Sequence, residues 1–210
     1  KATSAAATLN VIHPPKLLSE LEDDYTMVEG QTFALEPSFT GTLPISYTWS
    51  QGKTTFKTTS SSKLSVKSLT DKQAGTYTLT ATNAAGTSVH EVELDVILKP
   101  RIVKEPKGAN LNAGGTVTLA ATTSGSTPLI YQWYKDDQPY GKPAKRPELK
   151  LNKVAPEAGG EYHLRVTNAG GTAVSDEVDV IVYYAPTLTG TPVSATVADG
   201  GSHTFTAAAT

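Results

Sequence analysis

Polar and apolar residues alternate along many short segments of this 210-residue chain, among them residues 32–35, 45–49 and 77–81. A period of two sends alternate side chains to opposite faces of a strand, so each segment predicts a strand with one buried face. Turn-forming residues such as those at 83–86 separate the segments, and a single short helical turn is predicted at 70–75. Short strands at this spacing predict an all-β fold built from two-sheet sandwiches.

This pattern of strands and turns occurs twice in the chain. The segment Ala-Gly-Thr-Tyr-Thr-Leu-Thr-Ala-Thr-Asn-Ala-Ala-Gly at 74–86 has a close counterpart at 159–171, and the same offset of about 85 residues relates several other positions. An internal repeat of this length predicts tandem domains. The predicted domains are residues 13–99 and 100–185, with the start of a further domain at 186–210 and, at 1–12, either the last strand of a preceding domain or an N-terminal arm.

Large apolar residues recur at matched positions of the two repeats. Each repeat has one tryptophan, on the third predicted strand, and the repeated segment places a tyrosine and a leucine on one face of a later strand. An aromatic side chain of this size buries roughly 150–250 Å² and can dominate the packing of a small domain. We therefore predict a structural core that includes Trp49, Tyr77, Leu79, Trp133, Tyr162 and Leu164.

The repeated segment resembles the F strand and F–G turn of immunoglobulin domains, most closely those of the I-set. The resemblance places Tyr77 and Tyr162 at the tyrosine-corner position, where the hydroxyl bonds back to the chain. It also places Leu79 and Leu164 at the F-strand cysteine position, with Pro37 and Ala121 at the B-strand cysteine position. It thus implies tandem immunoglobulin-like β-sandwiches in which both members of each disulfide are replaced.

The chain has no cysteine, which excludes thiolate metal sites, cysteine nucleophiles and disulfides. Because small secreted β domains are commonly cross-linked, a chain without cysteine suggests assembly in a reducing cytoplasm. The net charge of −2 and the pI near 6.1 give no global bias toward nucleic acid. No stretch approaches the roughly 20 apolar residues that a membrane-spanning helix needs, so neither nucleic-acid binding nor membrane insertion is expected.

Catalytic and metal-binding patterns are not evident. The histidines His13, His90, His163 and His203 are scattered and are never paired at the spacing of metal ligands. The acidic run at 20–24 offers oxygen ligands for Ca²⁺, but it lacks the alternating pattern of a dedicated loop, and a solvated charged edge is the favoured reading. The sequence predicts no enzyme, and no catalytic, metal or cofactor site.

One cationic segment of the second repeat is a candidate ligand-binding site, formed by Tyr140, Lys142, Lys145 and Arg146. Charge is uneven between the repeats, with a net −3 over 13–99 and +1 over 100–185. Cationic side chains beside a tyrosine are suited to phosphate or carboxylate groups, such as those of a bacterial surface polysaccharide. The alternative is an ordinary solvated loop.

Prolines mark the predicted domain junctions at 14–15, 100 and 186, with almost no glycine or serine between one repeat and the next. Because proline fixes its own φ and restricts the preceding residue, the links are expected to be short and stiff. An array of such domains is expected to act as a rod.

Cysteine-free I-set-like domains of this composition resemble those of tailed bacteriophages, in particular the Hoc-type outer capsid decoration proteins of T4-like phages. That resemblance implies a non-catalytic display protein at the virion surface, assembled in the host cytoplasm and anchored to the capsid through a region outside this segment. It also implies weak attachment to host surface glycans. Two alternatives stay open: a phage tail or fibre module, or a bacterial cell-surface adhesin stalk; and an accessory spacer of a larger glycan-active enzyme.

Overall fold

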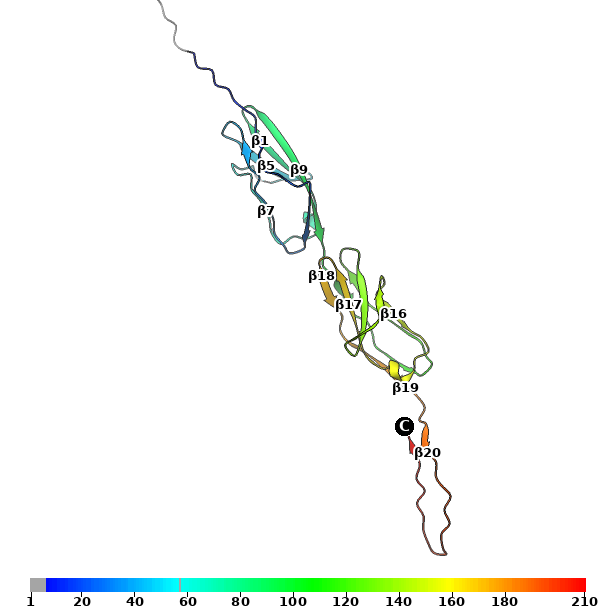
Figure 1. The fold of residues 1–210 in the computed structure, drawn as a ribbon. Helices are drawn as coiled ribbons and strands as arrows, with labels where there is room; N and C mark the ends of the chain where they lie inside the picture. The colour runs from blue at the N-terminus through cyan, green and yellow to red at the C-terminus, as the bar shows by residue number, and fades with distance from the viewer. Residues whose placement is uncertain (1–6, 57) are drawn as a thin grey trace, which may run out of the picture. The chain divides into compact units, whose positions relative to one another are not determined.

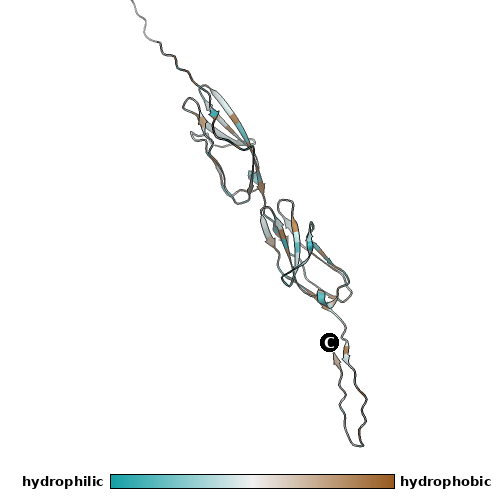
Figure 2. Ribbon diagram, in the orientation of Figure 1, coloured by the Kyte–Doolittle hydropathy of each residue, from teal (hydrophilic) through white to brown (hydrophobic). Residues whose placement is uncertain are grey.

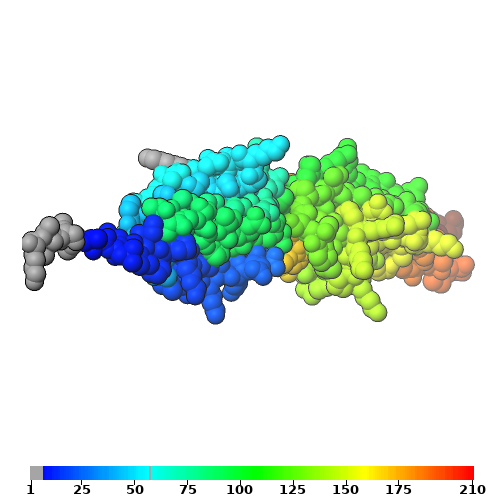
Figure 3. Space-filling model, turned by 90° about the horizontal axis from the view of Figure 1, so that it is seen from above, coloured from blue at the N-terminus to red at the C-terminus, as the bar shows by residue number. Residues whose placement is uncertain are grey.

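The computed structural model describes residues 7–56 and 58–210, which divide into two compact units (Figure 1). The first unit extends to Arg101 and includes Ser124–Leu129 and Val166–Ala173; the second holds Ile102–Thr123, Ile130–Arg165 and Val174–Thr210. Among the described residues no helix is long and apolar enough to cross a membrane. Figure 3 shows the surface of the two units as a space-filling view.

The first repeat is a two-layer sandwich of strands. One layer is a five-stranded sheet in the order β2-β9-β8-β5-β6, and the pairs β1-β4 and β3-β7 form the other strands. β2 runs parallel to β9, whereas β8 is antiparallel to both β5 and β9. The elements are β1 (Lys16–Leu17), β2 (Asp24–Val28), β3 (Phe33–Leu35), β4 (Phe39–Thr40), β5 (Ser46–Gln51), β6 (Thr54–Thr55), β7 (Leu64–Val66), η1 (Asp71–Gln73), β8 (Gly75–Asn83) and β9 (Gly86–Ile97).

The second repeat has the same architecture. Its main sheet has the order β11-β19-β17-β14-β15, with β18 also paired to β17, and the remaining strands pair as β10-β13 and β12-β16. β11 runs parallel to β19, as β2 does to β9. The elements are β10 (Arg101–Lys104), β11 (Ala109–Asn112), β12 (Val117–Ala120), β13 (Thr122–Ser124), β14 (Ile130–Lys135), β15 (Gln138–Ala144), β16 (Glu148–Leu151), η2 (Pro156–Ala158), β17 (Gly160–Asn168), β18 (Gly171–Val174) and β19 (Val178–Tyr183).

The core of each sandwich follows the period of two seen in the sequence, and hydrophobic and hydrophilic positions are interspersed along the strands in Figure 2. The six residues assigned to the core are all buried, with exposed fractions of 0–4% for Trp49, Tyr77, Leu79, Trp133, Tyr162 and Leu164. Pro37 and Ala121, at the other two positions that the resemblance assigned to cysteine, are buried as well. Apolar packing therefore occupies the space of both absent disulfides.

Two local devices recur in both repeats at the same offset. The Tyr77 hydroxyl donates to the carbonyl of Gln73 (2.9 Å), and the Tyr162 hydroxyl donates to that of Ala158 (2.8 Å). This is the tyrosine corner, which fixes the 3₁₀ turn, η1 or η2, that precedes each F strand. Burial raises the pKa of Tyr77 and, together with the nearby charges of Tyr140 and Asp136, raises that of Tyr162 to about 12.

The second shared device is an asparagine after each F strand. The Asn83 amide donates to the carbonyls of His13 and Thr42 (2.8 and 2.7 Å). The Asn168 amide donates in the same way to the carbonyls of Leu98 and Ser126 (2.8 Å each). Each asparagine thus ties the segment that enters its repeat to a turn of that repeat.

The repeats differ in the strand that closes the main sheet. β9 is continuous over Gly86–Ile97, whereas its counterpart is interrupted between β18 and β19. Val92 lies opposite Tyr77, and Val178 lies opposite Tyr162. One additional residue is therefore present between the F–G turn and this pair in the second repeat, which is the count of a β-bulge.

Short segments at the two ends of the chain lie outside the two whole repeats. Residues 7–12 form no strand, and 1–6 lie outside the described residues. At the other end, β20 (Leu188–Gly190) pairs antiparallel with β21 (Ala208–Ala209), as β1 pairs with β4 in the first repeat (Figure 1). The predicted domain boundaries, including the start of a further domain at 186–210, stay predictions.

Candidate functional site

The cationic segment lies at the edge of the main sheet in the second repeat. Tyr140 and Lys142 are on β15, and Lys145 and Arg146 are in the bend that joins β15 to β16. All seven residues of β15 are exposed. None of the salt bridges found among residues 7–56 and 58–210 involves the three cationic side chains. Their charges are therefore available to an external anion.

Tyr140 has a structural role in addition to its place beside these cations. Its ring packs edge-on against Tyr162, with centroids 5.6 Å apart, and 36% of the residue is exposed. Phe56 covers Tyr77 at the equivalent place in the first repeat, with centroids 6.2 Å apart. Tyr140 therefore packs against the core residue Tyr162 and is also exposed to solvent.

The same edge strand contains two prolines, Pro139 and Pro143. Because proline has no N–H, it cannot donate to an added strand, and prolines on sheet edges discourage pairing with other chains. The edge of β15 is thus suited to contacts made by side chains rather than to strand addition.

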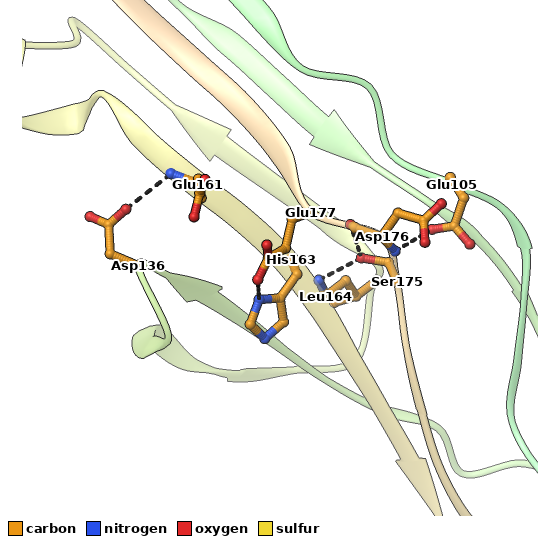
Figure 4. A network of polar contacts seen from close by, with 8 residues as sticks. All are labelled: Glu105, Asp136, Glu161, His163, Leu164, Ser175, Asp176 and Glu177. Carbon is orange, nitrogen blue, oxygen red and sulfur yellow. Dashed lines mark hydrogen bonds and ion pairs between the residues drawn. The ribbon is translucent and has the colours of Figure 1, made fainter.

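A second grouping of polar side chains lies in the same sheet, and Figure 4 shows two of its three members, His163 and Glu177. Asp137 follows β14 in the turn to β15, His163 is on β17, and Glu177 immediately precedes β19. His163 Nδ1 lies 3.7 Å from Glu177 Oε1, and one ligand atom from each of the three residues lies within 4.8 Å of the others. We call these three residues the His163 cluster.

The turn that bears Asp137 is a tight hairpin. Asp136 and Asp137 both have left-handed backbones, with φ of 48° and 60°, as the central residues of a type I′ turn require. Asp136 accepts hydrogen bonds from the Lys135 ammonium (2.8 Å) and from the Glu161 backbone N–H (3.0 Å). These two bonds hold the pKa of the Asp136 carboxyl below its ordinary value, and they tie the turn to β17.

The imidazole of His163 is held by an aromatic neighbour. Tyr134, on β14, stacks against the ring with centroids 4.9 Å apart and an interplanar angle of 8°. The Tyr134 hydroxyl accepts a hydrogen bond from Arg165 (3.3 Å). Only 14% of the His163 side chain is exposed, so stacking and partial burial together restrict the ring.

Glu177 follows the bulge in the closing strand. Ser175 Oγ accepts the Leu164 backbone N–H (2.8 Å) and donates to the Asp176 carbonyl (2.9 Å). The Asp176 N–H in turn donates to Glu105 (2.9 Å). Figure 4 shows this chain of bonds beside the His163–Glu177 pair. Bulges commonly redirect a side chain, and here the bulge precedes the residue that faces His163.

The described residues of the first repeat form no such grouping. Lys53 occupies the turn position of Asp137, and Thr78 occupies the strand position of His163. Thr78 faces Glu91 across β8 and β9 and donates to it over 3.4 Å. One carboxylate is thus retained, but the imidazole is absent and the second carboxylate is replaced by a cation.

The His163 cluster was missed by sequence reasoning, which looked for histidines at short spacing. Its members are 14 to 40 positions apart along the chain and meet only through strand pairing. The acidic run at 20–24, which sequence reasoning did consider, has exposed carboxylates and does not join a three-residue grouping among the described residues. Whether a histidine of a β-sandwich lies near other metal-binding side chains can therefore be judged only when the pairing register of its strands is known.

Comparison with known families assigns both repeats. Residues 15–96 match the immunoglobulin I-set domain, and residues 99–168 match the immunoglobulin domain family described as Ig_3. Among solved structures, the titin I-band fragment I67-I69 superposes with a TM-score of 0.69 at 22% identity, covering 87% of this chain and 70% of that one. Immunoglobulin domains 1–5 of Sidekick-1 superpose with a TM-score of 0.56 at 17% identity, covering 94% and 46%.

The curated relatives include animal proteins that are longer than this chain. Human fibroblast growth factor receptor-like 1 is 28% identical over 91% of this chain and 47% of its own length. Mouse nephrin is 25% identical over 96% of the chain and 18% of its own length, and mouse hemicentin-1 is 28% identical over 65% and 2%. This chain therefore spans less than half of each relative. The particular resemblance to phage decoration proteins stays a prediction. The chain is an all-β tandem of immunoglobulin-like domains of the I-set and Ig_3 types.

Proposed function

We propose that this chain is a non-catalytic display module, in which immunoglobulin-like domains present the cationic edge of β15 to anionic surface polysaccharide. The observation that carries the proposal is the exposure of Lys142, Lys145 and Arg146 beside an aromatic edge, without salt bridges in the described part of the chain. Exposed cations of this kind bind phosphate and carboxylate groups through charge, and arginine adds bidentate hydrogen bonds.

A structural role for the array is supported by the proteins that it resembles. The relatives include a muscle M-line assembly protein of Caenorhabditis elegans and the mouse basement membrane-specific heparan sulfate proteoglycan core protein. By analogy, the domains here act as spacers, and the side chains at their surface supply recognition. The stiffness expected of the proline-containing junctions would suit such a spacer.

We further propose that the module is displayed on the exterior of a phage capsid and is anchored through a region outside this segment. The support is the cysteine-free core, because leucine, proline and alanine fill the four half-cystine positions and no oxidising compartment is needed for folding. A tail or fibre module, a bacterial adhesin stalk and a spacer of a glycan-active enzyme are the competing assignments. An antibody against this chain that labels capsid exteriors in electron micrographs supports the proposal. Label on fibres or on the bacterial envelope contradicts it, as does hydrolysis of glycan by the longer protein.

Binding to immobilised lipopolysaccharide tests the polysaccharide assignment directly. The variant K142S/K145S/R146S is compared with K53S/K67S/K72S, which removes three exposed cations from the first repeat. We expect the first variant to lose binding and the second to retain it, and wild-type binding to weaken as salt rises from about 0.05 to 0.5 M because exposed charges are screened. Equal binding by both variants would overturn the assignment.

A further inference from the structure

We infer that the His163 cluster is a binding site for a divalent transition-metal ion of the Zn²⁺ class, with Asp137, His163 and Glu177 as its protein ligands. The inference is independent of polysaccharide binding, because none of the three residues belongs to the cationic segment. It rests on the spacing of the ligand atoms, on their chemistry, and on the structures that hold them in place.

The spacing of the three side chains suits a small tetrahedral ion. Zn²⁺ bonds to nitrogen and oxygen at about 2.0–2.2 Å, which separates neighbouring ligand atoms of a tetrahedral site by roughly 3.3–3.6 Å. His163 Nδ1 and Glu177 Oε1 are 3.7 Å apart, and all three ligand atoms lie within 4.8 Å of one another. Both carboxylate residues, Asp137 and Glu177, are exposed, so rotation of their side chains can shorten these separations without moving the sheet.

The ligand set indicates which metals are suitable. An imidazole with two carboxylates is a donor set for Zn²⁺, Ni²⁺ or Cu²⁺, whereas Mg²⁺ and Ca²⁺ prefer oxygen ligands alone. With a neutral imidazole the cluster carries two negative charges, which a divalent cation balances. Three protein ligands leave a fourth tetrahedral position open for water or for a donor group of another molecule.

Three features hold the ligands in position, and each comes from a different element. The type I′ turn, tied to β17 through Asp136, carries Asp137; stacking on Tyr134 restricts the His163 ring; and the bulge at Ser175 precedes Glu177. The interrupted closing strand is absent from the first repeat, which forms the same sandwich without it. The sandwich therefore does not require this bulge. The first repeat places Glu91 opposite Thr78 without one, so the bulge affects which residue of the closing strand lies beside His163 rather than whether a carboxylate does.

A simple ion pair between protonated His163 and Glu177 is the competing explanation. It needs neither Asp137 nor a metal, and its 3.7 Å separation is longer than a hydrogen bond. The two explanations can be distinguished because only the metal site predicts stoichiometric zinc binding. A histidine–glutamate pair alone does not produce it.

Isothermal titration of the 210-residue chain with ZnCl₂ tests the site. We expect one Zn²⁺ per chain, with affinity reduced at least about tenfold in E177Q and in H163Q, because loss of a ligand costs no less than loss of a supporting group. The variant D137K/H163T, which introduces the residues of the first repeat, should abolish binding. H13Q and H203Q remove exposed histidines elsewhere and serve as controls that should bind as wild type does.

Two further measurements keep the outcome clear. Thermal melts report whether each variant is folded, and E177Q alters an exposed side chain whose loss should leave the fold intact. Zn²⁺ should raise the melting temperature of wild type but not of E177Q, and excess Mg²⁺ should not compete. The inference is overturned if wild type binds no zinc at about 100 µM, if folded E177Q and H163Q bind it as wild type does, or if H13Q or H203Q abolishes binding.

Discussion

Truncation of Leu79 to alanine tests whether apolar packing replaces the absent disulfide. Leu79 lies at the F-strand half-cystine position, has no exposed surface, and belongs to a buried cluster with Trp49, Tyr77 and Val92. Alanine at this position removes three carbons from the centre of the first sandwich. Surrounding residues are held by two sheets and can collapse only partly into the space.

The expected cost is large for a domain of this size. Truncations of buried leucine lower the free energy of unfolding by about 2–5 kcal/mol, through lost burial and the cavity left behind. A domain of this class is stable by about 5–15 kcal/mol in total. With a urea dependence of about 1–3 kcal/mol per molar, the midpoint should fall by roughly 0.7–5 M.

Urea unfolding followed by tryptophan fluorescence measures this change, in a W133F background so that Trp49 alone reports on the first repeat. The matched control is V89A on the adjacent strand, since Val89 is 57% exposed and should cost no more than about 0.5 kcal/mol. The reasoning is refuted if L79A shifts the midpoint no further than V89A does.

Three other predictions concern the second repeat. Leu164→Asp places a charge at a fully buried position, so the second repeat should lose its cooperative melt in calorimetry; a sharp transition would contradict its place in the core. Asn168→Ala removes the two hydrogen bonds that the side-chain amide donates, and it should lower the free energy of unfolding by about 1–3 kcal/mol in urea titrations. A change below about 0.5 kcal/mol would contradict a stabilising role for these bonds. The lowered pKa of Asp136 makes its carboxylate stabilising above the ordinary value of 3.8, and this contribution is lost as pH falls through the lowered pKa of the folded state. Wild type and D136N should therefore converge in stability at acidic pH, and a constant difference down to pH 2 would refute the assignment.

The sandwich fold could be predicted because its signals are local. Alternation marks the strands, and the repeated Tyr-x-Leu segment places Tyr77, Leu79 and their counterparts on the buried face. The tyrosine corners follow from the same segment, because each hydroxyl bonds a carbonyl only four residues earlier.

The His163 cluster could not be predicted because it depends on register. The segments Glu-Leu-Asp-Val-Ile from Glu93 and Glu-Val-Asp-Val-Ile from Glu177 look equivalent in sequence, yet strand pairing aligns Val178 with Val92. The motifs are 84 residues apart, whereas the paired positions Val92 and Val178 are 86 apart, so the pairing differs from the motif by two positions that no local pattern predicted. Glu177 therefore faces His163 rather than the position that its sequence motif implied.

The sequence indicated only part of the role of Tyr140, for a related reason. Its place among lysines and an arginine indicated a ligand contact, whereas its ring also packs on Tyr162. Sequence spacing does not reveal which aromatic of an edge strand folds over the core. Lys142, Lys145 and Arg146 are free of this ambiguity because they are exposed.

The central claim, that recognition belongs to the cationic edge of the second repeat, is tested most directly by NMR. Amide chemical shifts of the ¹⁵N-labelled chain are recorded during titration with short anionic oligosaccharides from lipopolysaccharide. The account predicts that shift changes concentrate between Gln138 and Arg146 and disappear in K142S/K145S/R146S. Changes of equal size across the first repeat, or binding that moves no amide of β15 or its following bend, would contradict it.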